Sequence, residues 1–167
     1  MLNAPFALTD ASCWRRLDDL IVQARNEGIG DLAVAALIEH EGRFLLVEAP
    51  PTSDFDTAGI SWELPTGRIR PNEPLLQGLG RILAEHYSYG LARINGFLGQ
   101  SDHCHEGGFT VRVFTFAVEP AQPDSICRTA HLGHRWARGE DLVLAVRDIS
   151  PILQAYYQEY CANARFH

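Results

Sequence analysis

The chain contains no lysine: its 14 basic residues are all arginine, against 21 acidic residues and a formal net charge of −7. We attribute this bias to codon usage rather than to selection for the forked guanidinium group of arginine. A chain with this negative charge is not expected to bind nucleic acid or an anionic membrane non-specifically. The composition therefore excludes proteins whose affinity depends on a basic surface.

Long apolar runs and targeting signals are also missing. No stretch approaches the roughly 18 apolar residues of a membrane helix, and no basic segment precedes an apolar run at the N-terminus. The chain has four cysteines, Cys13, Cys104, Cys127 and Cys161. They form neither a C-x-x-C pair nor a zinc-finger spacing. We expect a cytoplasmic protein without a membrane segment, whose reduced cysteines mostly pack in the interior.

The remaining composition is typical of one compact domain over residues 1–167, with 46% hydrophobic and 21% charged residues. A chain of this length can bury about 68–70% of its unfolded surface. Residues 1–29 are predicted to form a helical extension, because their apolar residues share one helix face and Gly28 can end the helix. We expect the extension to pack against the core at 31–160 or against a partner subunit.

Strand patterns surround a segment that reads as a loop and a helix. Residues 33–48 predict a strand, a tight turn and a second strand. Residues 92–98 and 109–118 predict two more strands, the second alternating apolar and polar side chains like a half-buried strand. The residues between them, 100–108, are expected to form a loop. This alternation of strands and helices favours a mixed α and β architecture.

The most informative segment runs from residue 62 to residue 91. A Trp-x-x-Pro-x-Gly sequence is followed, at fixed intervals, by a glutamate, an arginine and a second glutamate. These positions are Trp62, Pro65, Gly67, Glu73, Arg81, Leu83 and Glu85. The segment resembles the Nudix box, in which three helix glutamates gather around a divalent ion. Ile82 and His86 stand where the family has two of those three glutamates.

The resemblance extends over about residues 32–160 and implies the fold and the chemistry. The implied fold is α/β (α+β), a Nudix α/β/α sandwich with a mixed β-sheet. The implied reaction is the hydrolysis of a diphosphate linked to another moiety. The pattern is most similar to small phosphatases that act on nucleoside di- and triphosphates and on thiamine-type diphosphates. The expected partner is a small phosphorylated molecule, and homodimer formation stays open.

The resemblance also implies roles for the residues of the box. Glu85 would bind Mg²⁺ or Mn²⁺ together with the backbone carbonyl of Gly67. Arg81 would brace Glu85 or contact a phosphate, and Glu73 would orient Arg81. His86 could replace an oxygen ligand by a nitrogen, which suits Mn²⁺ or Zn²⁺ better than Mg²⁺.

Further site residues are expected on the flanking strands and loops. The substrate contacts are assigned to Trp62, Glu63, Arg68 and Glu106. Glu106 or Asp102, from the loop beyond the box, could complete the metal shell. His103 and His105 would point the same way on a strand and could share an ion, but no third ligand follows at a characteristic spacing.

Position 82 decides between two functions, because isoleucine can be neither a metal ligand nor a base. A core stripe at Leu76, Leu79, Leu83 and Tyr87 would leave Ile82 on a neighbouring face beside Glu85. Alternatively, Ile82 is buried in the core. Two functions are therefore open. The chain is either a weakened metal-dependent hydrolase, or an inactive Nudix domain that binds a nucleotide or metabolite as a regulatory module, and burial of Ile82 would favour the second.

Overall fold

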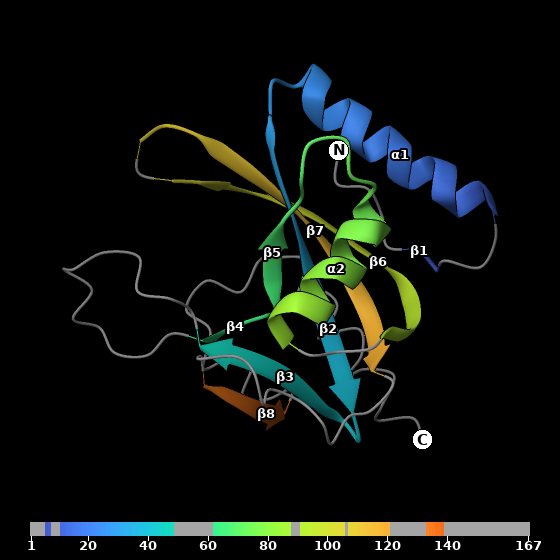
Figure 1. Ribbon diagram of the computed structural model, residues 1–167, viewed down its shortest axis with the longest axis vertical. Coiled ribbons are helices and arrows are strands. Elements are labelled where there is room, and N and C mark those ends of the chain that lie inside the picture. Colours follow the sequence, from blue (N-terminus) through green and yellow to red (C-terminus); the bar gives the residue numbers. More distant parts are fainter. Residues whose placement is uncertain are drawn as a thin grey trace.

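The computed structural model describes residues 6–7, 11–48, 62–87, 91–105, 107–120 and 133–138. Eight strands and two helices follow one another along these residues (Figure 1). They are β1 (Phe6–Ala7), α1 (Ala11–Asn26), β2 (Asp31–His40), β3 (Arg43–Glu48), β4 (Trp62–Glu63), β5 (Thr66–Arg68), α2 (Leu75–Tyr87), β6 (Leu91–Cys104), β7 (Thr110–Pro120) and β8 (His134–Arg138).

The strands form a mixed sheet, as the sequence predicted. Its main path runs in the order β1-β6-β7-β2-β3-β4, with β5 paired to β2 and β8 paired to β3. The neighbours β2 and β7 run parallel, and the remaining strand pairs are antiparallel. Val34 lies at the junction, opposite Phe114 of β7 on one side and Gly67 of β5 on the other. The long strand β2 therefore carries β5, and with it the start of the box.

The predicted strand–turn–strand over residues 33–48 is confirmed. The turn between β2 and β3 places Glu41 and Gly42 at φ angles of 50° and 72°. Two successive positive φ values are typical of the tight hairpin turns whose twist matches that of the strands.

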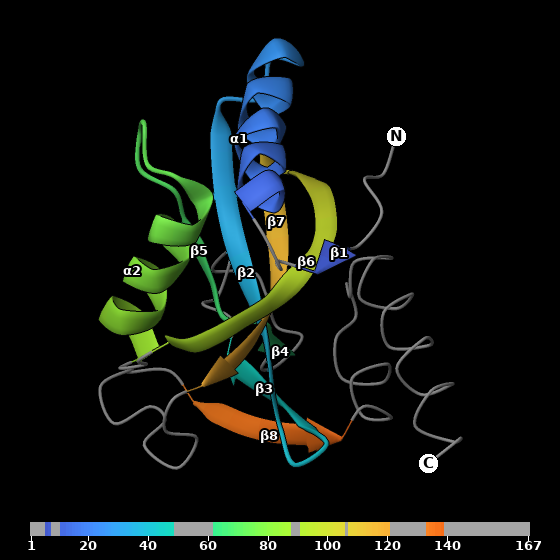
Figure 2. The ribbon, with the colours of Figure 1, turned by 90° about the vertical axis from the view of Figure 1, so that its right-hand side faces the viewer.

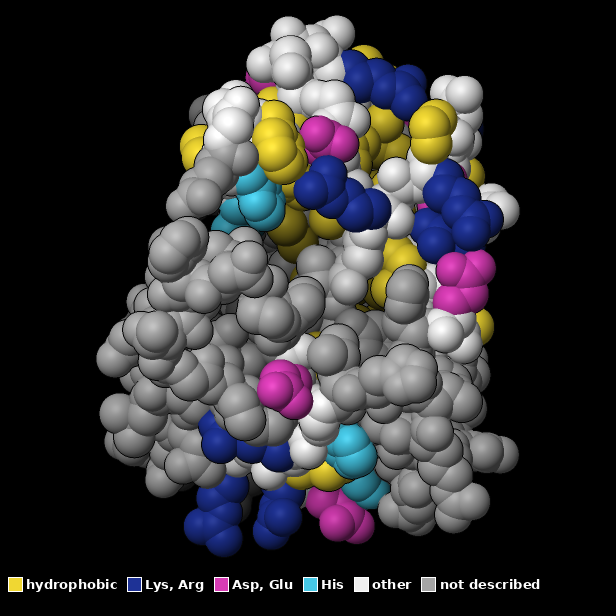
Figure 3. Space-filling view, turned by 60° about the vertical axis from the view of Figure 1, so that its left-hand side comes forward, with side chains coloured by type: hydrophobic (Ala, Val, Ile, Leu, Met, Phe, Trp, Pro, Cys, Tyr) yellow, Lys and Arg dark blue, Asp and Glu magenta, His cyan; other side chains and the backbone are white. Residues whose placement is uncertain are grey.

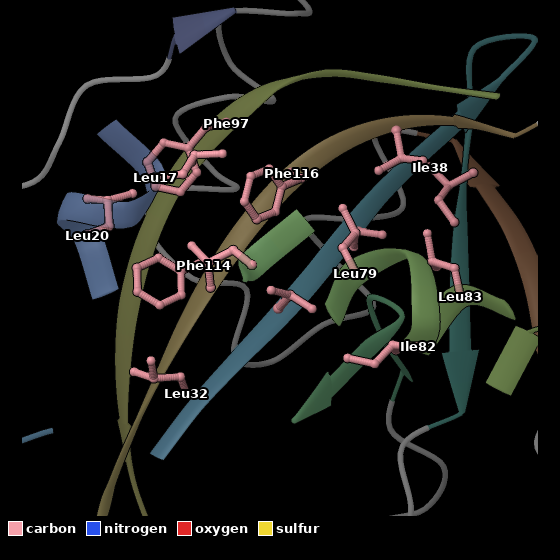
Figure 4. Close-up of a cluster of buried hydrophobic side chains, with 14 of the residues drawn as sticks. Leu17, Leu20, Leu32, Ile38, Leu79, Ile82, Leu83, Phe97, Phe114 and Phe116 are labelled. Atoms are coloured by element: carbon pink, nitrogen blue, oxygen red, sulfur yellow. The ribbon is translucent and has the colours of Figure 1, made fainter. Parts of the chain in front are cut away.

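Both helices pack on the same face of the sheet, where the main core lies (Figures 2 and 4). From α1, Leu17, Leu20 and Ala24 are buried there, so the N-terminal extension docks on the sheet of its own chain. Gly28, at φ 80°, ends the segment as predicted. Neither described helix has the length and apolar character needed to cross a bilayer.

The structure decides one open alternative and corrects two expectations. Of the two alternatives for Ile82, burial in the core is the one observed: Ile82 and Leu75 join Leu79 and Leu83 there. Strand β7 is buried on both faces along its centre, because a second apolar cluster covers the face opposite the helices. The expected loop at 100–108 is mostly strand, since β6 continues to Cys104. Cys104 itself is exposed. The structure does not describe the side chain of Cys13, nor residues 139–160, Cys127 and Cys161.

Candidate functional site

The arginine of the box is held by the first glutamate. Arg81 donates from Nε to Glu73 Oε1 at 2.7 Å and from Nη2 to Glu73 Oε2 at 2.8 Å. Two parallel bonds are the strong form of an arginine–carboxylate pair. The two side chains are largely buried, with 16% and 8% of their surface exposed. Hydrogen bonding to Arg81 lowers the pKa of Glu73 to about 2, so this carboxylate is ionised at neutral pH.

The same pair fastens the segment before α2 to the helix. Nη2 of Arg81 also donates to the backbone carbonyl of Arg68 at 2.9 Å. Glu73 Oε2 accepts the backbone N–H of Arg70 at 2.9 Å. Residues 68–73 are therefore tied to α2 at both ends by one guanidinium and one carboxylate.

A glycine in α2 makes room for this arrangement. A Cβ atom on Gly78 would lie 3.1 Å from Glu73 Oε2 and would collide with the side chain of Ile69. The helix keeps this glycine, at a cost of about 1 kcal/mol in helix propensity, because the carboxylate and the isoleucine approach its backbone closely.

The second glutamate lies between two arginines. Glu85 Oε2 lies 3.3 Å from Arg81 Nη1, and Glu85 Oε1 lies 3.4 Å from Arg70 Nη2. The Glu85 side chain keeps 47% of its surface exposed. Both carboxylate oxygens thus face positive charge supplied by the protein itself.

Ile82 occupies the space between α2 and the glycine of the box. Its side chain is 1% exposed and lies in the core cluster (Figure 4). A Cβ atom on Gly67 would come within 2.7 Å of Ile82 Cγ2, so the isoleucine lies directly on the backbone of β5. Hydrocarbon therefore fills the position where the box would place a carboxylate.

Two further predicted residues are Arg68 on β5 and Glu63 on β4. Arg68 Nη1 lies 3.0 Å from Asp31 Oδ1, and its guanidinium carbon lies 5.7 Å from the ring centre of Phe109. Burial raises the pKa of Glu63. Figure 3 shows arginine and acidic side chains around a hollow on the side of the molecule toward which the β6–β7 hairpin points.

Among the described residues, the predicted Asp102, His103 and His105 contact residues outside the box. Asp102 accepts two hydrogen bonds from Arg112, at 2.7 and 2.9 Å, instead of facing a metal. His103 contacts Ser101, and His105 stacks on Phe109. The side chains of Trp62 and His86, and all of Glu106, lie outside the described part of the structure.

Comparison with known proteins assigns the family, although no family model matches the chain. A NUDIX hydrolase from Nitrosomonas europaea is similar in structure, with a TM-score of 0.59, 23% identity, and coverage of 80% of this chain and 89% of that one. The CTP pyrophosphohydrolase of Escherichia coli (strain K12), a Nudix enzyme, is 31% identical over 126 residues, which cover 74% of this chain and 88% of that protein. The chain belongs to the Nudix hydrolase family. The solution structure of the E. coli ORF135 protein is similar too, with a TM-score of 0.64, 23% identity, and coverage of 79% and 91%.

Nudix hydrolases generally use divalent metals, so the donor set of this chain can be tested against one. Mg²⁺ prefers several oxygen ligands with carboxylates among them. Among the described residues, no three histidine, cysteine, aspartate or glutamate side chains gather where they could hold a metal. Glu85 faces two arginines, and Ile82 offers no donor atom. The described residues of this Nudix box do not fit a divalent metal site.

Two arginines of this Nudix domain were missed by the sequence reasoning. Arg70 was overlooked because the box does not specify its position, although it repeats the spacing of Arg68 along an extended segment. Arg112 is 5% exposed and joins Asp102 to Glu27 beyond α1, at 2.7 and 2.5 Å. The one sequence signal for a role of Arg112 is its position within a strongly apolar strand. Its partner Glu27 could not be inferred, because it lies 85 residues away in the chain.

Proposed function

We propose that this chain is a Nudix domain that binds a nucleoside di- or triphosphate and has lost efficient metal-dependent hydrolysis. The observation that carries the proposal is the burial of Ile82 against Gly67. A carboxylate is missing from the centre of the box, and the isoleucine side chain in its place packs directly against the backbone of Gly67. The relative that acts on CTP, as its name states, supports a nucleotide as the ligand class.

The loss of hydrolysis follows from the charges at the site. A divalent ion in a Nudix enzyme would supply neutralisation of phosphate charge and activation of a water molecule. Such an ion is attracted by an excess of carboxylates, whereas Glu85 is already balanced by Arg70 and Arg81. The affinity for Mg²⁺ is therefore expected to be low, and the water would lack its activating group.

The proposal is tested by measuring binding and turnover side by side. Isothermal titration with CTP, and with a panel of nucleoside di- and triphosphates, should give saturable binding. Phosphate or pyrophosphate release in Mg²⁺ or Mn²⁺ should be at least ~10²-fold slower than that of the E. coli CTP pyrophosphohydrolase, the scale of losing a central electrostatic stabiliser. Comparable turnover in the two proteins would contradict the proposal.

A second candidate function is slow metal-dependent hydrolysis, favoured by the 47% exposure of Glu85, which leaves its side chain room to turn away from the arginines. Glu85, the Gly67 carbonyl and His86 would then be the ligands. In that case Glu85→Gln should lower turnover by at least ~10²-fold. A histidine ligand binds metal only when neutral, so the metal affinity of the parent protein should fall at acidic pH. In His86→Ala this fall should be absent.

A further inference from the structure

The charged groups around the box cancel one another. Three guanidinium groups, those of Arg68, Arg70 and Arg81, lie within ion-pair distance of three carboxylates. The carboxylates belong to Asp31, Glu85 and Glu73. A cluster without excess negative charge does not concentrate divalent cations, but its guanidinium groups can bind a phosphate when a carboxylate moves away.

The three arginines differ in how firmly they are held. Arg81 is 16% exposed and is bound by both oxygens of Glu73, by the Arg68 carbonyl and by Glu85. Arg70 is 64% exposed, and within the described residues Glu85, at 3.4 Å, is its side-chain partner. A guanidinium group has five N–H donors, so most of those of Arg70 are open to a ligand.

The backbone of Arg70 is nevertheless fixed. Its N–H donates to Glu73 Oε2 at 2.9 Å, and that carboxylate is itself held by Arg81. Arg70 thus combines a positioned backbone with an accessible side chain beside the box helix. This combination favours ligand binding, because less freedom is lost when the ligand arrives.

We propose that this site binds the phosphate groups of its ligand without a divalent ion, with Arg70 as the phosphate-binding residue and Glu85 as the internal anion that the phosphate displaces. The inference rests on the proposed function, since it assumes that a phosphorylated nucleotide binds here. Guanidinium and phosphate pair through two parallel hydrogen bonds, which are stronger than the single 3.4 Å contact between Arg70 and Glu85.

The effect of Glu85→Gln on nucleotide affinity has opposite signs in this site and in a metal site. Where Glu85 holds a metal that bridges to phosphate, Glu85→Gln weakens nucleotide binding. Where Glu85 competes with phosphate for Arg70, the same change strengthens binding, because it frees the guanidinium group and removes a negative charge near the ligand. The gain should be about two- to fivefold, the size of an exposed ion pair.

The experiment is isothermal titration of the full chain with CTP in excess EDTA and again in Mg²⁺. The metal-free affinity should lie within about threefold of the affinity in Mg²⁺. Arg70→Gln should weaken metal-free binding by at least ~10-fold, as expected for a charge-assisted phosphate contact. Arg70→Lys should recover only part of this loss, since it keeps the charge without the fork. Arg25→Gln makes the same change of charge at an exposed position of α1 and should leave the affinity unchanged.

The outcomes separate the two proposals. Binding that requires Mg²⁺ and weakens in Glu85→Gln would overturn the metal-free site while leaving nucleotide binding intact. An absence of CTP binding under both conditions, in a protein that melts cooperatively, would overturn both proposals. Arg70 is exposed, so its variants should keep the melting temperature of the parent protein. If they do not, the direction of the Glu85→Gln effect still decides the question.

Discussion

The side chain of Ile82 lies on the backbone of Gly67, with its Cγ2 atom 2.7 Å from the place where a Cβ on that glycine would stand. In the Nudix box these two positions correspond to a carboxylate and to a backbone carbonyl of the metal site. In this chain they meet as hydrocarbon against glycine, within a core cluster that joins α2 to the sheet. Position 82 therefore contributes to core packing and offers no oxygen ligand.

Restoring the carboxylates should therefore not restore a metal site. In the double variant Ile82→Glu with His86→Glu, the glutamate at position 82 would be placed in the core, at a cost of about 3–5 kcal/mol of unfolding free energy. Thermal melts should show Tm lowered by roughly 6–20 °C, and titration should show no gain in Mg²⁺ affinity. Ile82→Val, which keeps the site apolar, should cost only about 0.5–1.5 kcal/mol. An unchanged Tm with tighter Mg²⁺ binding would show instead that position 82 faces the ligand.

Gly78→Ala should destabilise the protein although alanine is the better helix former. The end of the Ile69 side chain can rotate away from a new methyl group, but Glu73 is held by Arg81 and by the Arg70 backbone. We expect a net loss of about 1 kcal/mol, since overpacking outweighs the gain in propensity. Gly30→Ala, outside the helices, is the control for an added methyl group without a close contact, because nothing lies within 4 Å of its Cβ position. Equal melting temperatures for the two variants would contradict this explanation.

The sequence predicted the elements of the fold better than their burial. The periodicity of α1, the turn at Glu41–Gly42 and the spacing of the box each depend on residues close in the chain, and the structure confirms them. Burial depends on what covers an element from elsewhere. Strand β7 was predicted as half-buried because its pattern alternates, but apolar clusters cover it from both sides.

The same limit applies to the site. The pairing of Glu73 with Arg81 follows from the box, and the structure brings the two side chains together. The pairing of Glu85 with Arg70 could not be predicted, because it joins α2 to a segment whose path is set by β5 and by Glu73. Position 82 was ambiguous for a related reason: an isoleucine at that spacing suits either an exposed face or the core, and only the contact with Gly67 decides.

The buried arginine of β7 is predicted to fasten α1 to the sheet. Arg112 holds Asp102 across the hairpin and Glu27 at the end of the α1 segment. Arg112→Ala would remove the positive charge between these two carboxylates and leave Glu27, within the described residues, with only its hydrogen bond from Gln23, so we expect a loss of about 2–4 kcal/mol of unfolding free energy. Hydrogen exchange should show faster exchange of the α1 amides. Arg93→Ala, at an exposed position of β6, should change stability by no more than about 0.5 kcal/mol. Unchanged protection of α1 in Arg112→Ala would contradict the fastening role.

Acid should weaken the fold partly through Glu73. Its pKa is lowered from 4.5 to about 2, chiefly by the hydrogen bonds from Arg81. A carboxylate with a lowered pKa in the folded state stabilises above its unfolded pKa, and this contribution is lost as pH falls from about 4.5 toward 2. We expect about 2–3 kcal/mol from this group.

The measurement is the free energy of unfolding of the parent protein and of Glu73→Gln between pH 7 and pH 2. Asp102 and Glu27 also have lowered pKa values, because both bind Arg112, so the parent protein should lose stability in acid through several groups. Glu73→Gln should be less stable than the parent at pH 7, since Arg81 loses the charged partner that binds it through two hydrogen bonds. The two curves should converge as pH falls through the range in which Glu73 takes up its proton. Curves that stay parallel down to pH 2 would show that the Glu73–Arg81 pair does not contribute to the pH dependence.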